Sequence, residues 1–285
     1  MLTELFPEIN TRTHVMGIVN LTEDSFSGDG LMNAGSPVDA ALAQAQRFAE
    51  EGADVLDLGA ESTRPGAKPL AAHEEIARLV PVVEALREAL PEMPLSIDTY
   101  KAETAQACLR AGAQIINDIW GLRKDPEMAR VAAEAKAGII LMHNRRGEKT
   151  QQTALGGRYV DVDDADVVLS VREGLQVSLA LAKAAGFADG DIWLDPGIGF
   201  GKTSDQNLVL LRGLDRLTDM GYPVLLGISR KSFIGYTLNL PMEERLEGSL
   251  AANAWGVTQG VKVLRVHDVR ATVRLARMLD AIRLA

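Results

Sequence analysis

The chain has 285 residues, of which 47% are hydrophobic and 24% charged, a balance typical of a globular protein rather than a disordered one. Its formal net charge of −9 argues against nucleic-acid binding, because affinity for phosphate backbones depends on clustered Lys and Arg. The single cysteine, Cys108, excludes an internal disulfide, and no apolar run approaches the roughly 20 residues of a membrane span. Since the first ten residues also lack the pattern of a signal peptide, we expect a cytoplasmic protein.

Eight short runs rich in Val, Ile and Leu recur along the chain and predict β-strands. In chain order they cover residues 14–20, 54–59, 94–98, 114–119, 138–143, 191–195, 223–229 and 261–267. Most of them do not alternate apolar with polar residues. Unalternated apolar strands of this length are typical of parallel sheets that are buried on both faces.

Helical patterns lie between the predicted strands. Ser36 followed by Pro37 predicts a capped helix start, and Gly52 predicts the end of that helix. Further helices are expected to open at Asp125 and Ser204, to span residues 163–185, and to run from Asp268 to Leu284. Strands that alternate with helices predict a parallel α/β fold, either an open doubly wound sheet or a closed barrel. Eight evenly spaced units in fewer than 300 residues favour a single (β/α)8 TIM barrel over residues 1–285.

Polar residues stand at the C-terminal end of nearly every predicted strand. They are Asn20, Asp57, Asp98, Asn117, His143, Asp195, Ser229 with Lys231, and Arg265 with His267. The opposite strand ends show no such regularity. Because the C-terminal ends of barrel strands converge on one face, where active sites of this fold lie, these side chains predict the site.

Structural explanations compete with a functional one for several single residues. Asp57 is equally consistent with a cap for the following helix, and we interpret Asp118 as structural. His143 is better explained as a loop residue than as a ligand. Cys108 lies in an amphipathic helix and is expected in the core.

Two familiar motifs are absent. The segment DPGIGFGKT at 195–203 lacks the first glycine of a phosphate-binding P-loop, since Pro196 stands there, and Lys202 breaks the dinucleotide-binding glycine pattern. The sequence also contains no H-E-x-x-H motif and no cluster of histidines for zinc. These absences argue against nucleotide triphosphatase, dinucleotide-binding and zinc-protease functions.

The strand-end residues suit a flat heterocycle that carries an anion. Asp98, Asn117 and Asp195 can bond an amide edge and an exocyclic amine, and the planar guanidinium of Arg265 can stack on a ring. Phosphate groups in such barrels lie after the last strands, where a helix N-terminus follows. Asn20 offers one hard oxygen to a Mg²⁺ held chiefly by diphosphate. Two Gly- and Ser/Thr-rich loops, 21–30 and 59–69, are expected to close over the ligand.

Seven segments resemble, in order and spacing, the motifs of dihydropteroate synthases. They are MGIVNLTEDSF (16–26), ESTRPG (61–66), SIDT (96–99), NDIWG (117–121), LDPGIGFGK (194–202), GISRKSFIG (227–235) and RVHDV (265–269). Together the motifs extend over about 250 residues. The resemblance implies that the chain condenses 6-hydroxymethyl-7,8-dihydropterin diphosphate with p-aminobenzoate, in a Mg²⁺-dependent homodimer that sulfonamides target.

The resemblance also implies a role for each matching residue. Asp98, Asn117, Asp195, Lys231 and Arg265 would bind the pterin, and Asp98, Asp195, Lys231 and Arg265 would be catalytic. Asn20, Arg64, Arg265 and His267 would bind the diphosphate, with Asn20 as the Mg²⁺ ligand. Phe26, Thr63, Pro65, Phe200, Ser229 and Lys231 would shape the p-aminobenzoate site.

Two segments depart from the family pattern, and two other functions share its pterin site. The first loop reads LTEDSFSGDG, with Glu23 where the family commonly has proline, and residues 144–162 are unusual in Arg and Gln content. One alternative is a pterin-dependent methyltransferase, which would not need Ser229, Lys231 or His267. The other is a catalytically inactive homologue that only binds a pterin.

Overall fold

The computed structural model describes residues 1–21, 36–61, 69–145, 150–153 and 155–285. Its main sheet contains eight parallel strands. They are β1 (His14–Asn20), β2 (Val55–Gly59), β3 (Leu95–Asp98), β4 (Ile115–Asp118), β5 (Gly138–Met142), β8 (Ile192–Asp195), β9 (Leu225–Gly227) and β10 (Val263–Val266). Each predicted strand is confirmed, although most are shorter by one to four residues.

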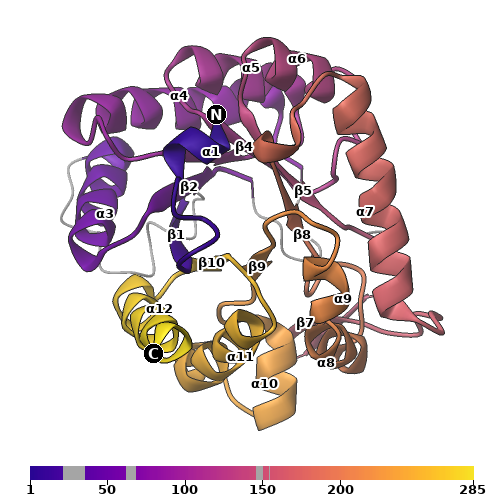
Figure 1. The fold of residues 1–285 in the computed structure, drawn as a ribbon. Coiled ribbons are helices and arrows are strands. Elements are labelled where there is room, and N and C mark those ends of the chain that lie inside the picture. The colour runs from indigo at the N-terminus through magenta and orange to yellow at the C-terminus, as the bar shows by residue number, and fades with distance from the viewer. Residues whose placement is uncertain (22–35, 62–68, 146–149, 154) are drawn as a thin grey trace.

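The sheet closes on itself. The strand order is β8-β5-β4-β3-β2-β1-β10-β9, and a parallel bridge between Leu194 and Val224 joins the two ends. The helices surround the strands (Figure 1). The barrel is therefore confirmed, and the open doubly wound sheet was the wrong alternative. Parallel pairing brings all C-terminal strand ends to one face of the molecule.

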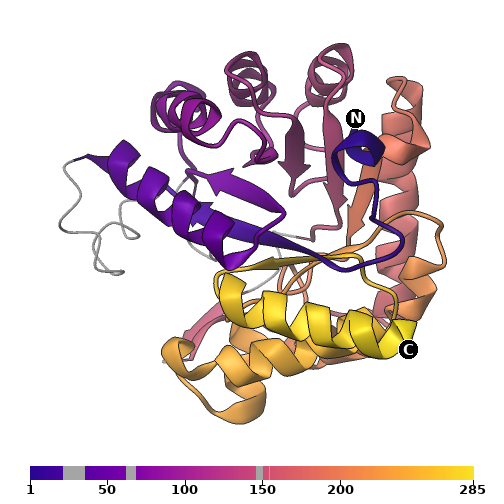
Figure 2. The same ribbon diagram turned by 60° about the vertical axis from the view of Figure 1, so that its left-hand side comes forward.

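The helices occupy the intervals between the strands. They are α1 (Leu2–Leu5), α3 (Pro37–Glu51), α4 (Ala72–Ala89), α5 (Ala102–Arg110), α6 (Met128–Glu134), α7 (Val167–Ala184), α8 (Ser204–Arg212), α9 (Asp215–Thr218), α10 (Ser232–Leu238), α11 (Leu246–Thr258) and α12 (Val269–Leu284). Short 3-10 turns lie at Asp189–Asp191 and Met242–Glu244. Figure 2 shows α3 and α12 side by side along the outside of the barrel. No helix among the described residues is both long and apolar enough to cross a membrane.

The helix ends test the capping predictions. Ser36 caps α3 by accepting a hydrogen bond from the Asp39 amide, and Gly52 ends that helix in the left-handed conformation, as predicted. The prediction for α8 was wrong by one residue. Thr203, not Ser204, is the N-cap, and it exchanges side-chain hydrogen bonds with Gln206 in a capping box.

The N-terminal end of the barrel is closed by an apolar cluster. Helix α1 lies across this end (Figure 1), and its Leu2 packs with Phe6 and with inward-facing strand residues. The cluster consists of Leu2, Phe6, Ile9, Met16, Val55, Ile115, Ile140, Trp193, Leu225 and Val263. The buried imidazole of His14, two residues before Met16 on β1, meets the Phe6 ring edge-on at this end, with ring centroids 5.4 Å apart.

A two-stranded antiparallel hairpin, which the sequence did not predict, lies between β5 and α7. Its strands are β6 (Thr150–Thr153) and β7 (Gly156–Tyr159), and β7 contacts α10. The hairpin follows a C-terminal strand end and therefore belongs to the same face as the predicted site.

Candidate active site

A network of carboxylates around one guanidinium occupies the C-terminal end of the barrel interior. Arg265 of β10 donates from Nε to Asp57 at 2.6 Å and from Nη2 to Asp98 at 2.7 Å. Asn117 of β4 donates to the same Asp57 oxygen at 3.1 Å. The strands place these groups together because Asp98 and Asn117 are register partners on β3 and β4. The structure thus brings together most of the predicted pterin-binding residues.

Asp57 belongs to this network, and the helix-cap interpretation was wrong. Its side chain is fully buried and accepts hydrogen bonds from Ser96, Asn117 and Arg265. The strand continues to Gly59, so Asp57 points into the barrel two residues before the strand ends. An isolated strand end cannot distinguish this placement from a cap, whereas the repeat of inward-facing polar residues on neighbouring strands could have done so.

Burial and charge set the ionisation of the two groups at the centre. Burial disfavours the charged form of Arg265, but Asp57 and Asp98 outweigh this effect and raise its pKa above the usual value. Burial raises the pKa of Asp195, and Lys231, the Gly197 amide and Arg265 oppose that rise. Arg265 therefore stays cationic, while Asp195 is a carboxyl group that holds its proton more readily than an exposed one.

Two loops after β8 and β9 meet beside Asp195. Lys231 donates to the Ile198 carbonyl, and its Nζ lies 4.6 Å from the ring centroid of Phe200. Lys202 is buried behind the β8 loop, where Nζ donates to the Gly197 and Phe200 carbonyls at 2.9 and 3.1 Å. Burial lowers the pKa of Lys202 to about 7. Lys202 holds the loop that presents Phe200, a role that the sequence pattern did not indicate.

Ser229, His267 and Asn20 lie at the rim of the same face. The Ser229 hydroxyl accepts a hydrogen bond from the His267 amide at 3.2 Å and lies 3.1 Å from His267 Nδ1. A hollow of about 460 Å³ opens here. Asn20, Gln44, Arg47, Phe48, Glu51, Arg230, Leu246, His267, Asp268, Val269, Arg270, Ala271 and Arg274 line it. Its four arginines against two carboxylates give it a positive balance within an acidic protein, and α12 begins at its edge.

The structure supports the sequence-based interpretation of Asp118, Cys108 and His143 as structural rather than functional residues. Asp118 is buried and accepts from the Trp120 and Leu122 amides, and burial raises its pKa to about 6. Cys108 lies in the core, and burial raises the pKa of its thiol to about 12. Burial, reinforced by Lys202, lowers the pKa of His143 to about 2, so this imidazole is a neutral buried side chain.

Some predicted residues fall outside the described part of the chain. Phe26, Thr63, Arg64 and Pro65, and most of the two loops 21–30 and 59–69, are not among the described residues. Among the residues that are described, no group of three or more His, Cys, Asp or Glu side chains could hold a metal ion. Any metal at the Asn20 rim would therefore depend mainly on oxygens of a ligand.

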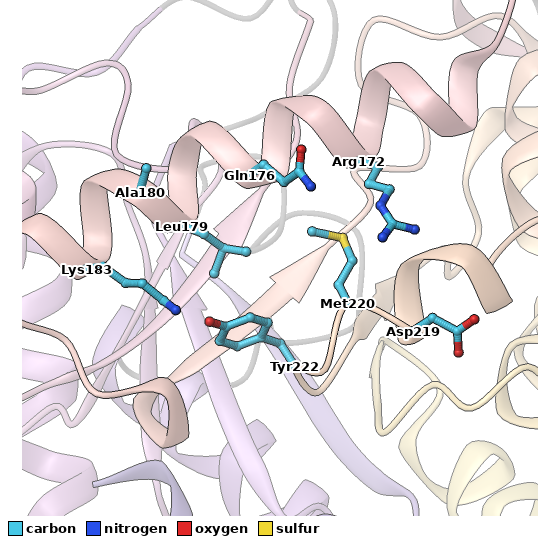
Figure 3. A pocket seen from close by; sticks show the side chains of 8 residues that line it. All are labelled: Arg172, Gln176, Leu179, Ala180, Lys183, Asp219, Met220 and Tyr222. Atoms are coloured by element: carbon cyan, nitrogen blue, oxygen red, sulfur yellow. The ribbon is translucent and has the colours of Figure 1, made fainter.

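A second hollow lies far from these groups. It measures about 480 Å³ and is lined by α7 and by the segment before β9, as Figure 3 shows. Lys183 at the end of α7 and Tyr222 just before β9 place it toward the N-terminal strand ends. It shares no residue with the carboxylate network, so it is not the candidate active site.

Comparison with known proteins adds a family to this geometry. Residues 16–267 match the family model for pterin-binding enzymes. The chain is 44% identical over 275 residues to the dihydropteroate synthase of Clostridium beijerinckii, covering 96% of each chain, and 44% identical to that of Bacillus subtilis, covering 95% and 88%. A dihydropteroate synthase structure from Xanthomonas albilineans with 4-aminobenzoic acid superposes with a TM-score of 0.87 at 40% identity, covering 96% of this chain and 94% of that one.

Proposed function

This chain belongs to the dihydropteroate synthases, transferases of folate synthesis within the pterin-binding enzyme family, and from that premise we propose how its residues divide the reaction. The substrates are 6-hydroxymethyl-7,8-dihydropterin diphosphate and p-aminobenzoate, and the products are 7,8-dihydropteroate and diphosphate. The observation that carries the proposal is the placement of Asp98, Asn117, Asp195, Lys231 and Arg265 around one end of the barrel interior.

The pterin ring binds among these groups. Carboxylate and amide oxygens of Asp98, Asn117 and Asp195 accept hydrogen bonds from ring N–H groups, and the planar guanidinium of Arg265 stacks on the ring. Asp57 touches Arg265 and Asn117 rather than the ring, and so holds both in place. A titratable carboxyl such as Asp195 can accept a hydrogen bond from a ring N–H or share its proton with the ring.

The carbon–oxygen bond to diphosphate breaks early, and positive charge spreads over the pterin. The carboxylates of Asp98 and Asp195 stabilise that charge. The departing diphosphate is stabilised by His267, by the amides at the start of α12 and, from outside the described residues, by Arg64. The hollow beside Asn20 and His267 is lined by more arginines than carboxylates, and this excess of positive charge also favours departure of the anionic diphosphate.

The amine binds between the two loops after β8 and β9. Phe200 contacts its ring, and Lys231 and Ser229 lie on the side that receives its carboxylate. Phe26, Thr63 and Pro65 complete this subsite in the proposal. The aryl nitrogen carries a free lone pair near neutral pH, so it attacks the methylene carbon without a strong general base, and the arylammonium formed then gives its proton to the departed diphosphate or to water.

Mg²⁺ fits the donor set as a partner of the diphosphate. Asn20 supplies one hard oxygen at the rim, and Mg²⁺ commonly combines one or two protein ligands with phosphate oxygens and water. Bound there, Mg²⁺ would neutralise charge on the leaving group.

We also propose a cytoplasmic homodimer that sulfonamides inhibit. Exposed apolar side chains gather on α7, α8 and α11, which pack in sequence around the barrel: Leu169, Val177, Leu181, Leu208, Val209 and Trp255. Exposed apolar side chains on neighbouring helices are typical of a subunit interface. A dihydropteroate synthase from Yersinia pestis has been crystallised as a sulfonamide drug complex, which supports the same sensitivity here.

The direct test is diphosphate release from 6-hydroxymethyl-7,8-dihydropterin diphosphate, with and without p-aminobenzoate and with Mg²⁺ or a chelator. We expect release that requires the amine and Mg²⁺ and that yields dihydropteroate in equal amount. Pterin binding without any release would instead support a binding-only homologue. Methyl transfer from methyltetrahydrofolate would support the methyltransferase.

A further inference from the structure

The hairpin β6–β7 is held at its turn by three donors from one segment of the chain. Three consecutive carbonyls, those of Leu155, Gly156 and Gly157, each accept a side-chain hydrogen bond. Arg245 Nη2 donates to Leu155 at 3.0 Å, the Tyr236 hydroxyl to Gly156 at 2.8 Å, and the Ser232 hydroxyl to Gly157 at 2.8 Å. The hairpin therefore docks onto α10 and the residues that follow it, immediately after Lys231.

Arg245 also binds two other segments from the same buried position. Its side chain donates to the Arg230 carbonyl at 3.1 Å and, from Nε and Nη2, to the Leu240 carbonyl at 3.1 Å. The residue is only 4% exposed, and burial lowers its pKa although Glu243 opposes this. Gly235 leaves room for the guanidinium, since a Cβ at that position would lie 2.2 Å from Nη2.

The Arg230 carbonyl belongs to the turn that presents the amine subsite. Arg230 has a left-handed φ of 57°, which a non-glycine residue adopts at a cost, so the turn needs external support. Support comes from Arg245 at the carbonyl and from Ser249, whose hydroxyl accepts from the Arg230 amide at 2.9 Å. The next residue is Lys231, whose Nζ reaches the Ile198 carbonyl and the Phe200 ring.

The residues that flank the hairpin are tied to one another and to α8, the helix after the other loop of the subsite. Arg145 pairs with Asp164 at 2.5 Å, and Gln206 donates to the Val162 carbonyl at 3.1 Å. Gln206 also completes the capping box with Thr203, directly after the loop of Phe200 and Lys202. The chain around the hairpin therefore contacts α8, which follows the loop of Phe200, and α10, which follows Lys231.

We propose that Arg245 is a positioning residue, which with the docked hairpin acts as an outer brace that fixes Lys231 against Phe200 and so sets the affinity for p-aminobenzoate. The inference rests on the proposed amine subsite. Arginine is needed because one planar group must donate to three carbonyls in three segments, which an ammonium on a flexible stem cannot do in the same geometry.

The test compares Arg245→Met and Arg245→Lys with Arg87→Met. Arg87 is a matched control, because it also donates to main-chain carbonyls and burial also lowers its pKa, but it lies in α4 away from the site. We expect Arg245→Met to raise KM for p-aminobenzoate about 10-fold, while the dissociation constant of the pterin diphosphate changes by less than about 2-fold. Arg245→Lys should restore only part of the difference, and Arg87→Met should leave KM unchanged.

Milder variants keep the test decisive if Arg245→Met does not fold. Tyr236→Phe removes one donor to the hairpin, and Tyr222→Phe removes a comparable hydroxyl contact with Asp189 outside the site. Tyr236→Phe should raise KM for p-aminobenzoate and speed hydrogen exchange of amides 155–158 and 230–232. Because exchange needs no turnover, it separates failure of the brace from failure of the proposed reaction. Unchanged KM in both Arg245→Lys and Tyr236→Phe, or equal weakening of pterin and amine binding, would overturn the proposal.

Discussion

Along the same strands, the barrel interior changes from apolar to charged or polar side chains within two residues. Val55, Ile115, Trp193 and Val263 face one another at the N-terminal end and belong to the apolar cluster under α1. Two residues further on, and therefore on the same inward face, stand Asp57, Asn117, Asp195 and Arg265. One end is filled mainly by hydrocarbon, with His14 against the edge of Phe6, and the other contains the network of Asp57, Asp98 and Arg265.

This difference explains how the barrel can keep a charged network in its interior. The apolar end closes the barrel to water from below, so the electrostatic interactions above it act in a medium of low dielectric. Asp57 then accepts hydrogen bonds from the Arg265 guanidinium, from Asn117 and from Ser96, so that these buried polar groups are paired. We expect changes at the polar end to act on turnover, and changes at the apolar end to act on stability.

The largest expected effect is that of Asp57→Ala. The change leaves Arg265, Asn117 and Ser96 without a common acceptor and leaves a buried cation short of one partner. We expect a loss of about 3–5 kcal/mol in the free energy of unfolding and a fall in kcat of at least about 100-fold. Urea titration and the diphosphate-release assay measure the two effects. A stable, active variant would show that the network is not what organises this end.

At the apolar end, Phe6→Ala should reduce stability without changing the chemistry. Phe6 is 2% exposed, and its ring centroid lies 4.9 Å from that of Trp193. We expect a loss of about 3–5 kcal/mol from the cavity and the lost burial. The KM values and kcat, measured well below the melting temperature, should match those of the unaltered enzyme. A selective change in either KM would show that the apolar end affects substrate binding and would contradict this comparison.

His143 gives a smaller effect that depends on pH. Because burial lowers its pKa to about 2 from 6.5, the unfolded chain binds a proton below pH 6.5 that the folded chain does not. Stability should therefore fall as pH decreases below 6.5, by up to about 1.4 kcal/mol per unit, and this contribution should vanish above 6.5. His143→Asn should flatten the slope of stability between about pH 4.5 and about pH 6.5 and leave it unchanged above that range. Identical slopes in both proteins would mean that the imidazole is protonated in the fold.

The last of these predictions concerns the helix layer around the barrel, where neither turnover nor stability is expected to change. Burial raises the pKa of the Cys108 thiol to about 12, and Glu75 adds to the rise, so little thiolate exists near neutral pH. The native protein should react with a chromogenic disulfide reagent at least about 1,000-fold more slowly than the unfolded chain. Rapid labelling of the native enzyme would show that α5 opens from the barrel.

The sequence predicted the barrel because its strands are short runs of Val, Ile and Leu with polar ends, a pattern determined locally. It left Asp57 undecided, because a single strand end does not distinguish an inward-facing carboxylate from a helix cap; only the repeat of polar residues on the neighbouring strands does so. The hairpin at Thr150–Tyr159 was missed for a similar reason. Its sequence has no apolar alternation, and its turn is held by Ser232, Tyr236 and Arg245, which lie about 75 to 90 residues further along the chain.

The central claim is tested most directly by two changes on β8, Asp195→Asn and Trp193→Leu, assayed for diphosphate release and for urea stability under the same conditions. The side chains are two residues apart on one strand and both face the barrel interior. We predict that Asp195→Asn loses at least about 100-fold in kcat and little stability, whereas Trp193→Leu loses about 1–3 kcal/mol of stability and keeps its kcat. Equal loss of activity in both variants would contradict the division of the barrel into a catalytic end and a sealed end.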